Sequence, residues 1–465
     1  MDSRDLRFIT NACGGKLLAG SADLPVERVC TDSRQARPGD LFIALAGERF
    51  DGHDFVNEVL AKGVAAVMTQ PSRAPADSRG RGVIVVPDTR KALGALAARY
   101  RLEFEIPIIA VGGSNGKTTT KELIAHVLRQ KLETVWSEAS FNNDIGVPMT
   151  LLKLDRRHQA AVMEAGTNHP GELAPLVRMI KPQYGVITSI GREHLEFFKT
   201  IEGVSEEEGW LAELLPPEGK LLVNGDNAWS GSIAKRTRAG VVRIGLEEGN
   251  DWSAKGIRFE KGGAAFQIET PRREFQGEYR IQLIGRHQIS NALFAIALGA
   301  ELGLDREQIQ RGLASCRGAK MRLQLWEVNG IQVLDDAYNA NTDSMAAALE
   351  TLRELPCDGR KVAVLGDMAE LGETSRAAHE EVGRRAAELG VEQLFAVGRM
   401  AADMGRGARL GGLNRVFEFA DVEAAAAAVK SFVKSGDALL LKASRATRIE
   451  RVGELLRGEP MAFVS

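Results

Sequence analysis

The sequence predicts an α/β protein built from three consecutive blocks of strands and helices. Short apolar runs of strand length alternate with helical stretches along 465 residues. This alternation is typical of mostly parallel sheets with helices on both faces. A chain of this length holds two to four domains, each able to bury its own core. Interruptions of the pattern place the blocks at residues 1–103, 104–318 and 319–465.

The composition allows a soluble multidomain enzyme. The formal net charge is −2, so nothing favours binding to nucleic acid or to a membrane surface. No apolar run approaches the roughly 20 residues of a membrane span, and the N-terminus lacks the form of a signal peptide. We therefore expect a cytoplasmic protein without stable membrane association. A monomer is a separate expectation, which the composition does not determine. Free, buried thiols are expected because no zinc or redox spacing joins the four cysteines, Cys13, Cys30, Cys316 and Cys357.

The first block contains short strands, a helix and a polar loop. Apolar runs predict strands at residues 40–45, 65–68 and 82–86, and a helix follows over 89–100. Residues 71–82 are rich in proline, arginine and glycine, which predicts a loop. Residues 101–107 form the link to the second block.

The second block opens with a phosphate-binding pattern at residues 108–120. A buried apolar strand leads into a glycine-rich turn, and Lys117 and Thr118 open a helix. Backbone N–H groups of such a turn point at phosphate oxygens, the lysine reaches the β- and γ-phosphates, and the threonine hydroxyl coordinates Mg²⁺. Val111 stands where the general P-loop has its first glycine, so this is a shortened variant. The nucleotide-binding candidates are Gly113, Ser114, Asn115, Gly116, Lys117, Thr118 and Thr119.

The alternative for this stretch is an ordinary strand–turn–helix with a chance Gly-Lys-Thr. The three consecutive threonines after the lysine and the clean strand before it argue against that interpretation.

Further strands of the second block are predicted at residues 160–164, 185–190 and 220–224. Ligands of open α/β sheets bind beyond the carboxyl ends of the strands, where Glu164 and His194 fall. Glu164 could ligate the Mg²⁺ of the nucleotide, and His194 could serve a second divalent ion or position the substrate. Each could instead be a surface or capping residue. Period-two alternation over 252–284 predicts a small antiparallel appendage.

The third block again predicts a doubly wound sheet. Its strands fall at residues 333–336, 361–366, 394–398 and 438–442, with helices between them. The alanine run at 424–428 is interpreted as helix.

Segments in all three blocks together resemble the Mur ligases, the ATP-dependent amide-forming enzymes of peptidoglycan synthesis. The order and spacing of the motifs match, and the segments DDAYNAN and VLGDMAELGE are the most specific. The motifs lie at 31–34, 50–53, 113–122, 142–148, 164–166, 194–196, 335–341, 364–373 and 442–445.

The resemblance implies a three-domain Mur ligase architecture, with a central P-loop domain containing a parallel sheet and a Rossmann-like C-terminal domain. It is strongest to the member that joins D-alanyl-D-alanine to UDP-N-acetylmuramoyl-tripeptide, with ATP and Mg²⁺, through an acyl phosphate. The first block would hold the UDP-sugar-peptide, and the third would close over ATP and bind the amino substrate. Ser33 and Arg34 would lie near the uridine and diphosphate, with Asp51 and His53 as further substrate-binding candidates. A simple polar turn is the alternative for Ser33 and Arg34, since Pro38 and Gly39 follow.

The resemblance also assigns roles around ATP. Glu164 would be a metal ligand and His194 would lie at the second metal. Asn291 would face the adenine, although the family often has asparagine where this chain has Gln288. Further candidates are Asn142 in the active-site loop, Arg322 at the phosphates, Asp336, Tyr338 and Asn339 over the nucleoside, and Lys442 near the reaction. An Asx turn is the alternative for Asn142 and Asn143.

One position departs from the family. Glu208 stands where the family carries a lysine whose amine is carbamylated by CO₂ and assists the metal site. A glutamate supplies a permanent carboxylate, but it is shorter than the carbamate by roughly 3–4 Å, so a water would have to bridge it to Mg²⁺. The alternative is that Glu206, Glu207 and Glu208 form a solvated acidic helix face.

Two other functions remain open at this point. One is a different ligase of the superfamily, such as another Mur ligase or a folylpolyglutamate synthetase. The other is a P-loop protein whose ATP hydrolysis drives a conformational switch. The segment at 335–341 argues against the first, and the metal and third-block candidates argue against the second.

Overall fold

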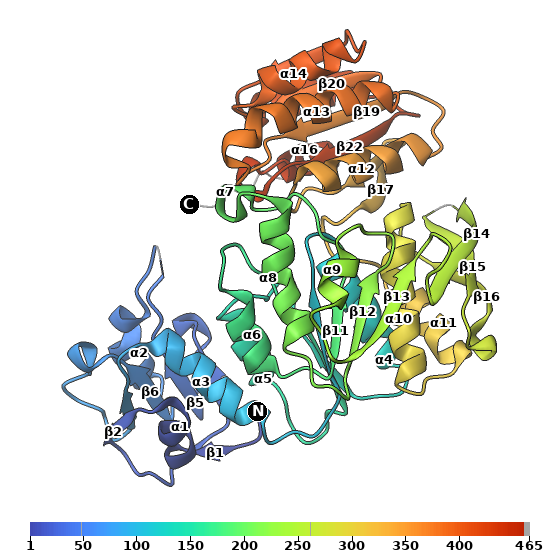
Figure 1. Ribbon diagram of the computed structural model, residues 1–465. Coiled ribbons are helices and arrows are strands. Elements are labelled where there is room, and N and C mark those ends of the chain that lie inside the picture. Colours follow the sequence, from blue (N-terminus) through green and yellow to red (C-terminus); the bar gives the residue numbers. More distant parts are fainter. Residues whose placement is uncertain (48, 261, 460–465) are drawn as a thin grey trace.

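The computed structural model describes residues 1–47, 49–260 and 262–459. These residues form three α/β units, each around its own main sheet, and the central unit lies between the other two (Figure 1). The predicted α/β fold class is confirmed.

The first unit has a five-stranded sheet in the order β2-β7-β6-β5-β4, parallel except for the β2–β7 pair. Its elements are β2 (Lys16–Ala19), β4 (Arg28–Cys30), β5 (Asp40–Ile43), β6 (Ala66–Thr69), β7 (Gly82–Val85), the antiparallel pair β1 (Arg4–Asp5) and β3 (Pro25–Val26), and the helices α1 (Leu6–Cys13), α2 (Val56–Ala61) and α3 (Thr89–Arg101).

Helix α3 joins the first unit firmly to the central one. It packs on α5 (Gly146–Leu151) and α6 (Leu173–Ile180). The buried Arg101 guanidinium donates to the carbonyls of Ile180 (2.9 Å), Phe104 (2.7 Å) and Lys181 (3.2 Å). The Tyr100 hydroxyl donates to the Leu154 carbonyl at 2.7 Å. The carbonyls left free at the end of α6 thus gain donors from another unit.

The central sheet has nine strands in the order β16-β15-β14-β13-β12-β11-β8-β10-β9. The strands are β8 (Ile108–Gly112), β9 (Thr134–Trp136), β10 (Ala160–Glu164), β11 (Tyr184–Ile187), β12 (Lys220–Asn224), β13 (Gly240–Gly245), β14 (Trp252–Glu260), β15 (Gly263–Glu269) and β16 (Gly277–Ile281). The small antiparallel appendage predicted at 252–284 is present as β14, β15 and β16. Its strands are antiparallel, but β14 pairs in parallel with β13 and so extends the main sheet.

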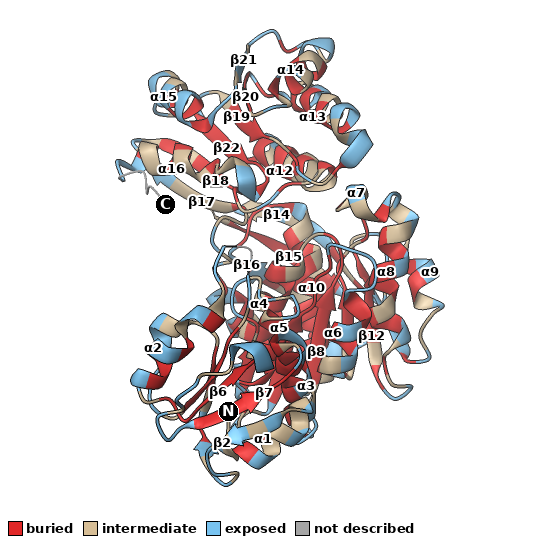
Figure 2. Ribbon diagram, turned by 90° about the vertical axis from the view of Figure 1, so that its left-hand side faces the viewer, coloured by how far each residue is buried: buried red, intermediate tan, exposed pale blue. Residues whose placement is uncertain are grey.

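Both faces of the central sheet are covered because its strands are apolar on both sides. Ile108 and Ala110 of β8 face one core, and Ile109 and Val111 face the other. The strands are accordingly buried while the outer faces of the helices are exposed (Figure 2). Besides α5 and α6, the helices are α4 (Lys117–Leu128), α7 (Leu195–Phe198), α8 (Ile201–Glu213), α9 (Ser230–Ala234), α10 (Arg286–Glu301) and α11 (Arg306–Ser315).

The C-terminal unit has a six-stranded sheet in the order β17-β18-β22-β19-β20-β21, parallel except for the β17–β18 pair. Its elements are β17 (Gln324–Val328), β18 (Ile331–Asp335), β19 (Lys361–Gly366), β20 (Gln393–Val397), β21 (Val416–Phe419), β22 (Ala438–Lys442), α12 (Thr342–Glu354), α13 (Ser375–Glu388), α14 (Ala401–Leu410), α15 (Val422–Phe432) and α16 (Glu450–Arg457).

The composition raised two points that concern helices long enough to span a membrane and the state of the cysteines. Within the described ranges, no helix has both the length and the apolar character needed to cross a membrane. All four cysteines are free thiols. Cys30 and Cys316 are buried as expected, whereas Cys13 and Cys357 are only partly buried, which corrects the expectation for these two.

Candidate functional site

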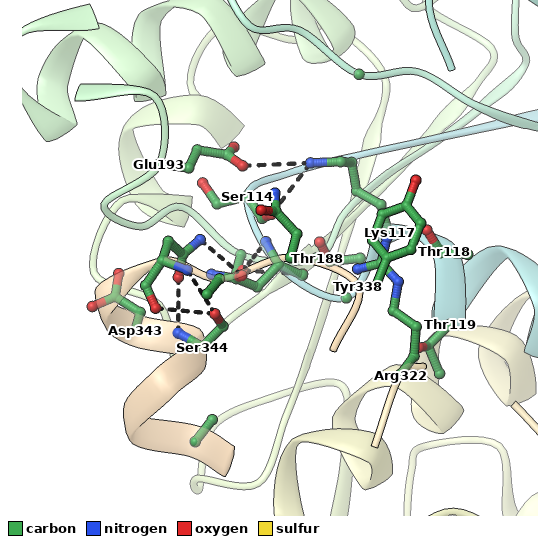
Figure 3. A pocket seen from close by; sticks show the side chains of 18 of the residues that line it. Ser114, Lys117, Thr118, Thr119, Thr188, Glu193, Arg322, Tyr338, Asp343 and Ser344 are labelled. Carbon is green, nitrogen blue, oxygen red and sulfur yellow. Dashed lines mark hydrogen bonds and ion pairs between the residues drawn. The ribbon is translucent and has the colours of Figure 1, made fainter. Parts of the chain in front are cut away.

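A cavity of about 490 Å³ opens where β8, β10 and β11 end, between the central and C-terminal units (Figure 3). The central and C-terminal units both contribute residues to its wall. Its position agrees with the rule that ligands of open α/β sheets bind beyond the carboxyl ends of the strands. The predicted residues that line it are Ser114, Asn115, Gly116, Lys117, Thr118, Thr119, Asn142, Glu164, His194, Asn291, Arg322, Asp336, Tyr338, Asn339 and Lys442.

The glycine-rich turn has a fixed shape. Gly116 has φ +90°, and a Cβ there would lie 2.7 Å from the Asn291 side-chain oxygen, so only glycine fits. The Ser114 amide donates to the Ser189 carbonyl (2.7 Å), and the Asn115 amide donates to the Ser189 hydroxyl (3.1 Å). The end of β11 therefore braces the turn at which helix α4 begins.

Lys117 is mostly buried, with 13% of its side chain exposed, and points back at its own turn. Its ammonium donates to the carbonyls of Gly113 (2.5 Å) and Ser114 (3.2 Å) and lies 3.6 Å from Glu193 Oε2 (Figure 3). Desolvation is the largest single influence and opposes its charge, but the carboxylates of Glu193, Glu208 and Glu164 outweigh it and raise the pKa of Lys117. Lys117 is therefore held as a cation at the floor of the cavity.

The residues around Glu164 fit a magnesium ion. Glu164 Oε1 accepts from the Thr118 hydroxyl (3.2 Å) and the Asn142 amide (3.0 Å). Its Oε2 is buried without a hydrogen-bond partner and lies 3.8 Å from Lys121 Nζ. A buried carboxylate oxygen beside a hydroxyl oxygen is a donor set that suits a hard cation.

No larger cluster of metal-binding groups forms in the part of the chain that the structure describes, where three histidine, cysteine or carboxylate side chains never gather at one point. Mg²⁺ is commonly held by one or two carboxylates together with substrate phosphates, so Glu164 and Thr118 are enough protein ligands for it.

The two asparagines of the active-site loop have different roles. Asn143 forms the Asx turn, because its side-chain oxygen accepts from the amides of Ile145 (3.1 Å) and Gly146 (2.9 Å). Asn142 instead points at Glu164. The Asx-turn alternative therefore holds for Asn143 and not for Asn142.

The C-terminal unit presents a cation and an aromatic ring to the cavity. The Arg322 guanidinium lies 4.0 Å from the centroid of the Tyr338 ring and donates to the Ser140 hydroxyl at 3.3 Å. Lys442 is buried, forms an ion pair with Asp336 and donates to the Asn339 carbonyl at 2.9 Å. Burial lowers the pKa of Lys442, and Asp336 opposes that shift. Lys442 thus fixes the loop that carries Asp336 and Asn339.

Side chains from the central unit grip the C-terminal unit beside the cavity. Arg192 donates to Asp343 (Nε to Oδ1, 2.9 Å) and to Glu381 (Nη1 to Oε2, 2.8 Å), and the bond to Glu381 is the main cause of its raised pKa. Asn341 donates to Asn115 of the glycine-rich turn at 3.0 Å. We call Arg192, Asp343 and Glu381 the clasp.

Glu208 lies behind the turn and outside the lining of the cavity. Its Oε2 accepts from the Gly113 amide at 2.7 Å, and its Oε1 is buried without a partner. Glu207 is also buried and accepts from the amides of Gly171 and Leu173, while Glu206 is exposed. The alternative of a solvated acidic face is therefore wrong for Glu207 and Glu208.

The substrate-binding candidates of the first unit lie in two short turns away from this cavity. Ser33 and Arg34 belong to one turn, in which the exposed Arg34 pairs with Asp32 at 2.8 Å. Asp51 caps the other turn, and its carboxylate bonds to the buried His53 ring at 2.6 Å. His53 is thus oriented by Asp51.

Several residues of the site were missed by the sequence analysis. Glu193, Asn341 and Asp343 line the cavity, and Glu370 bonds to His194. Lys121 is buried and donates to the carbonyls of Ser137 (2.7 Å) and Ala139 (2.6 Å). The segments at 335–341 and 364–373 contain or adjoin three of these residues, but no local pattern shows which side chains reach another unit.

Comparison with known proteins agrees with this geometry. Three family models match the chain: the Mur ligase family catalytic domain over residues 25–101, the Mur ligase middle domain over 111–299, and the Mur ligase glutamate ligase domain over 321–445. The UDP-N-acetylmuramoyl-tripeptide–D-alanyl-D-alanine ligase of Escherichia coli (strain K12) is 36% identical, with 98% of this chain and 99% of the relative covered. The enzyme of the same name from Bacillus subtilis (strain 168) is 34% identical, with 94% of each covered.

Solved structures agree as well. A crystal structure of MurF from Acinetobacter baumannii superposes with a TM-score of 0.88 at 32% identity, covering 98% of this chain and 99% of that one. MurF ligase from Thermotoga maritima in complex with ADP gives a TM-score of 0.81 at 28% identity, covering 93% and 97%. A P-loop that shares its cavity with a C-terminal unit, and relatives this similar over the whole length, lead to one conclusion: the chain belongs to the Mur ligase family.

Proposed function

We propose that this protein joins D-alanyl-D-alanine to UDP-N-acetylmuramoyl-tripeptide with ATP, forming ADP, in the cytoplasmic synthesis of peptidoglycan precursors. The observation that carries the proposal is a single cavity lined by Lys117 and Thr118 from one unit and by Arg322, Tyr338 and Lys442 from another. The names of the full-length relatives supply the two substrates.

The chemistry explains why this cavity is built mainly of charges and donors. A carboxylate is a poor electrophile, so ATP first phosphorylates the peptide carboxylate to an acyl phosphate. The amine of the dipeptide then attacks the carbonyl carbon, and phosphate leaves. Lys117 and Arg322 are placed to neutralise charge on the transferring phosphoryl group. The C-terminal unit closes the cavity, which keeps water from the acyl phosphate.

Mg²⁺ would be held by Glu164 and the Thr118 hydroxyl, and His194 would lie at a second ion. The ion would supply Lewis-acid stabilisation of phosphate charge. Asn142 orients Glu164 toward this position.

The sugar-peptide would bind across the first unit. Arg34 is exposed and fully charged, as contact with a diphosphate requires, and Ser33 lies beside it. Replacing Asp32 by the diphosphate as the partner of Arg34 would cost little free energy, because the Arg34 side chain is in water.

A ligation assay tests the proposal. The protein is incubated with ATP, Mg²⁺, D-alanyl-D-alanine and the UDP-tripeptide carrying either diaminopimelate or lysine, and the UDP-pentapeptide is sought by mass. The assignment is supported if product forms with the dipeptide but not with L-alanine or D-glutamate as the amine. A folate incubated with glutamate, in place of both substrates, should also give no product. Product with another amine instead points to a different ligase of the superfamily. ATP turnover without ligation of any amine would overturn the proposal in favour of a P-loop switch.

A further inference from the structure

Building on the proposed function, we infer that Glu370 is a positioning residue that orients His194, so that this side of the site is complete only when the C-terminal unit is docked. His194 comes from the central unit, at the start of α7, and Glu370 comes from the loop after β19. The two side chains meet through a hydrogen bond between His194 Nδ1 and Glu370 Oε2 across 176 residues of sequence. Both line the nucleotide cavity.

The backbone on both sides is held in a conformation that ordinary residues avoid. His194 has φ +50° and Glu370 has φ +60°, and neither is a glycine. Left-handed backbone at a non-glycine residue is unfavourable and persists where the surroundings impose it. A second bond fixes the pairing, because the Glu196 amide donates to the Glu370 carbonyl at 2.9 Å.

The hydrogen bond determines which ring nitrogen of His194 is available. A carboxylate accepts, so Nδ1 is the donating nitrogen of this bond and Nε2 is the nitrogen left for a second partner. Nε2 lies 3.9 Å from Glu193 Oε2, on the side of Lys117. The His194 side chain is only 14% exposed, so it cannot turn freely. If a divalent ion binds beside His194, Glu370 would hold the ring with Nε2 free to contact it, as carboxylates behind metal-binding histidines do.

A purely structural role for Glu370 would be to help dock the C-terminal unit. The clasp already links the same two units through three charged side chains. What distinguishes Glu370 is that its partner is a residue of the cavity. If Glu370 only docks the C-terminal unit, its effect should not require His194. If Glu370 positions His194, its effect on metal binding should disappear when His194 is removed.

The experiment measures metal binding without turnover. Mn²⁺ binding to the full-length protein with ADP is followed by electron paramagnetic resonance for the wild type, Glu370→Ala, Glu370→Gln and Glu373→Ala. Loss of such a supporting carboxylate commonly weakens metal binding by about 10–100-fold, so we expect a shift of that size for Glu370→Ala. Glu370→Gln keeps an acceptor for Nδ1 and should recover much of the loss. Glu373→Ala changes an exposed neighbour and should match the wild type.

The same change in a His194→Ala background separates positioning from docking. If Glu370 acts through His194, Glu370→Ala has no further effect on Mn²⁺ binding there. An unchanged Mn²⁺ affinity for Glu370→Ala, or an equal loss with and without His194, would overturn the inference. Circular dichroism checks the fold, and Glu370→Met, which keeps the length of the side chain but has no carboxylate, replaces Glu370→Ala if that variant does not fold. A wild type that binds Mn²⁺ and ADP but ligates no dipeptide would refute the proposed function and leave this inference standing.

Discussion

The carboxyl groups of Glu164, Glu193 and Glu208 lie close enough to Lys117 to raise the pKa of its ammonium, so this cation already has partners within the protein. An ATP phosphate arriving at Lys117 must displace it from the Gly113 and Ser114 carbonyls, and a metal ion relieves the remaining negative charge of the phosphates. The nucleotide and the ion should therefore bind together.

Replacing Lys117 by alanine should reduce kcat by about 10²–10³-fold, because a donor that stabilises charge growing in the transition state is lost. The matched control is Lys131→Ala, which removes an exposed lysine just after the same helix. Ligation kinetics with saturating ATP measure the effect. A Lys117→Ala protein that ligates at nearly the wild-type rate would show that this lysine does not act on the phosphates.

Glu208 offers a test of the departure from the family. Since a glutamate needs no carbamylation, ligation should be indifferent to added bicarbonate and to its removal. Glu208→Ala should raise the Mg²⁺ concentration for half-maximal rate, because Glu208 also holds the Gly113 amide of the turn. The exposed Glu206→Ala is the control. Bicarbonate-dependent activity, or an unchanged Mg²⁺ requirement in Glu208→Ala, would contradict this role.

The thermal stability of the ligand-free protein should depend on pH because of Glu208. Burial raises its pKa from 4.5 to about 7, although Lys117 opposes the shift. Between these values the folded state binds the proton more tightly than the unfolded state, so this contribution to stability is complete below pH 4.5 and is lost as the pH rises through 7. Glu208→Gln mimics the protonated form, so its Tm should rise relative to the wild type from pH 5 to pH 8. For the control Glu206→Gln, the difference in Tm from the wild type should stay constant over this pH range. A constant difference for Glu208→Gln as well would contradict a raised pKa of the Glu208 carboxyl.

At the scale of elements, helix α3 is the joint between the first two units. Arg101→Met should lower the Tm by several degrees, because it leaves three backbone carbonyls without a donor and each such buried group costs about 1–3 kcal/mol. Arg99→Met, on the same helix, removes a half-exposed arginine whose ion pair with Glu103 measures 3.8 Å. Thermal unfolding followed by fluorescence compares the two variants, and equal Tm values would argue against the joint.

The elements were predictable where the local pattern is complete. The strand, turn and helix of residues 108–120, and the strands β10, β12, β19 and β22, follow from apolar runs and glycine position alone. The continuity of β14 with β13 did not follow, because alternation reveals a strand but not its neighbour. Pairings such as His194 with Glu370 escaped prediction because they join distant segments. Neither asparagine of the loop could be assigned until the structure showed which one reaches Glu164.

For the whole molecule, the contacts of the C-terminal unit suggest how it moves. Asp336 and Lys117 must face one nucleotide, and residues 317–320, where the second block meets the third, contain a glycine and two charged residues that suit a hinge. ATP with the UDP-peptide should compact the molecule. Small-angle scattering should show a smaller radius of gyration with ligands than without.

Arg192→Ala, which breaks the clasp of the closed arrangement, should enlarge the radius of the ligand-bound protein and raise the KM for ATP. Arg258→Ala, in an exposed pair on β14, is the control. Equal radii in all states would exclude closure.

The clasp and the joint at α3 differ in how strongly dissolved salt should weaken them. The clasp is made of charges that are each about a third exposed, so dissolved ions reach them, and at 1 M salt the screening length falls to about 3 Å. The joint at α3 is made of hydrogen bonds to carbonyls and of an apolar core shared with the central unit, which ions do not screen. Rising ionic strength should therefore weaken the clasp and loosen the hold on the C-terminal unit, while the joint at α3 keeps the first unit in place.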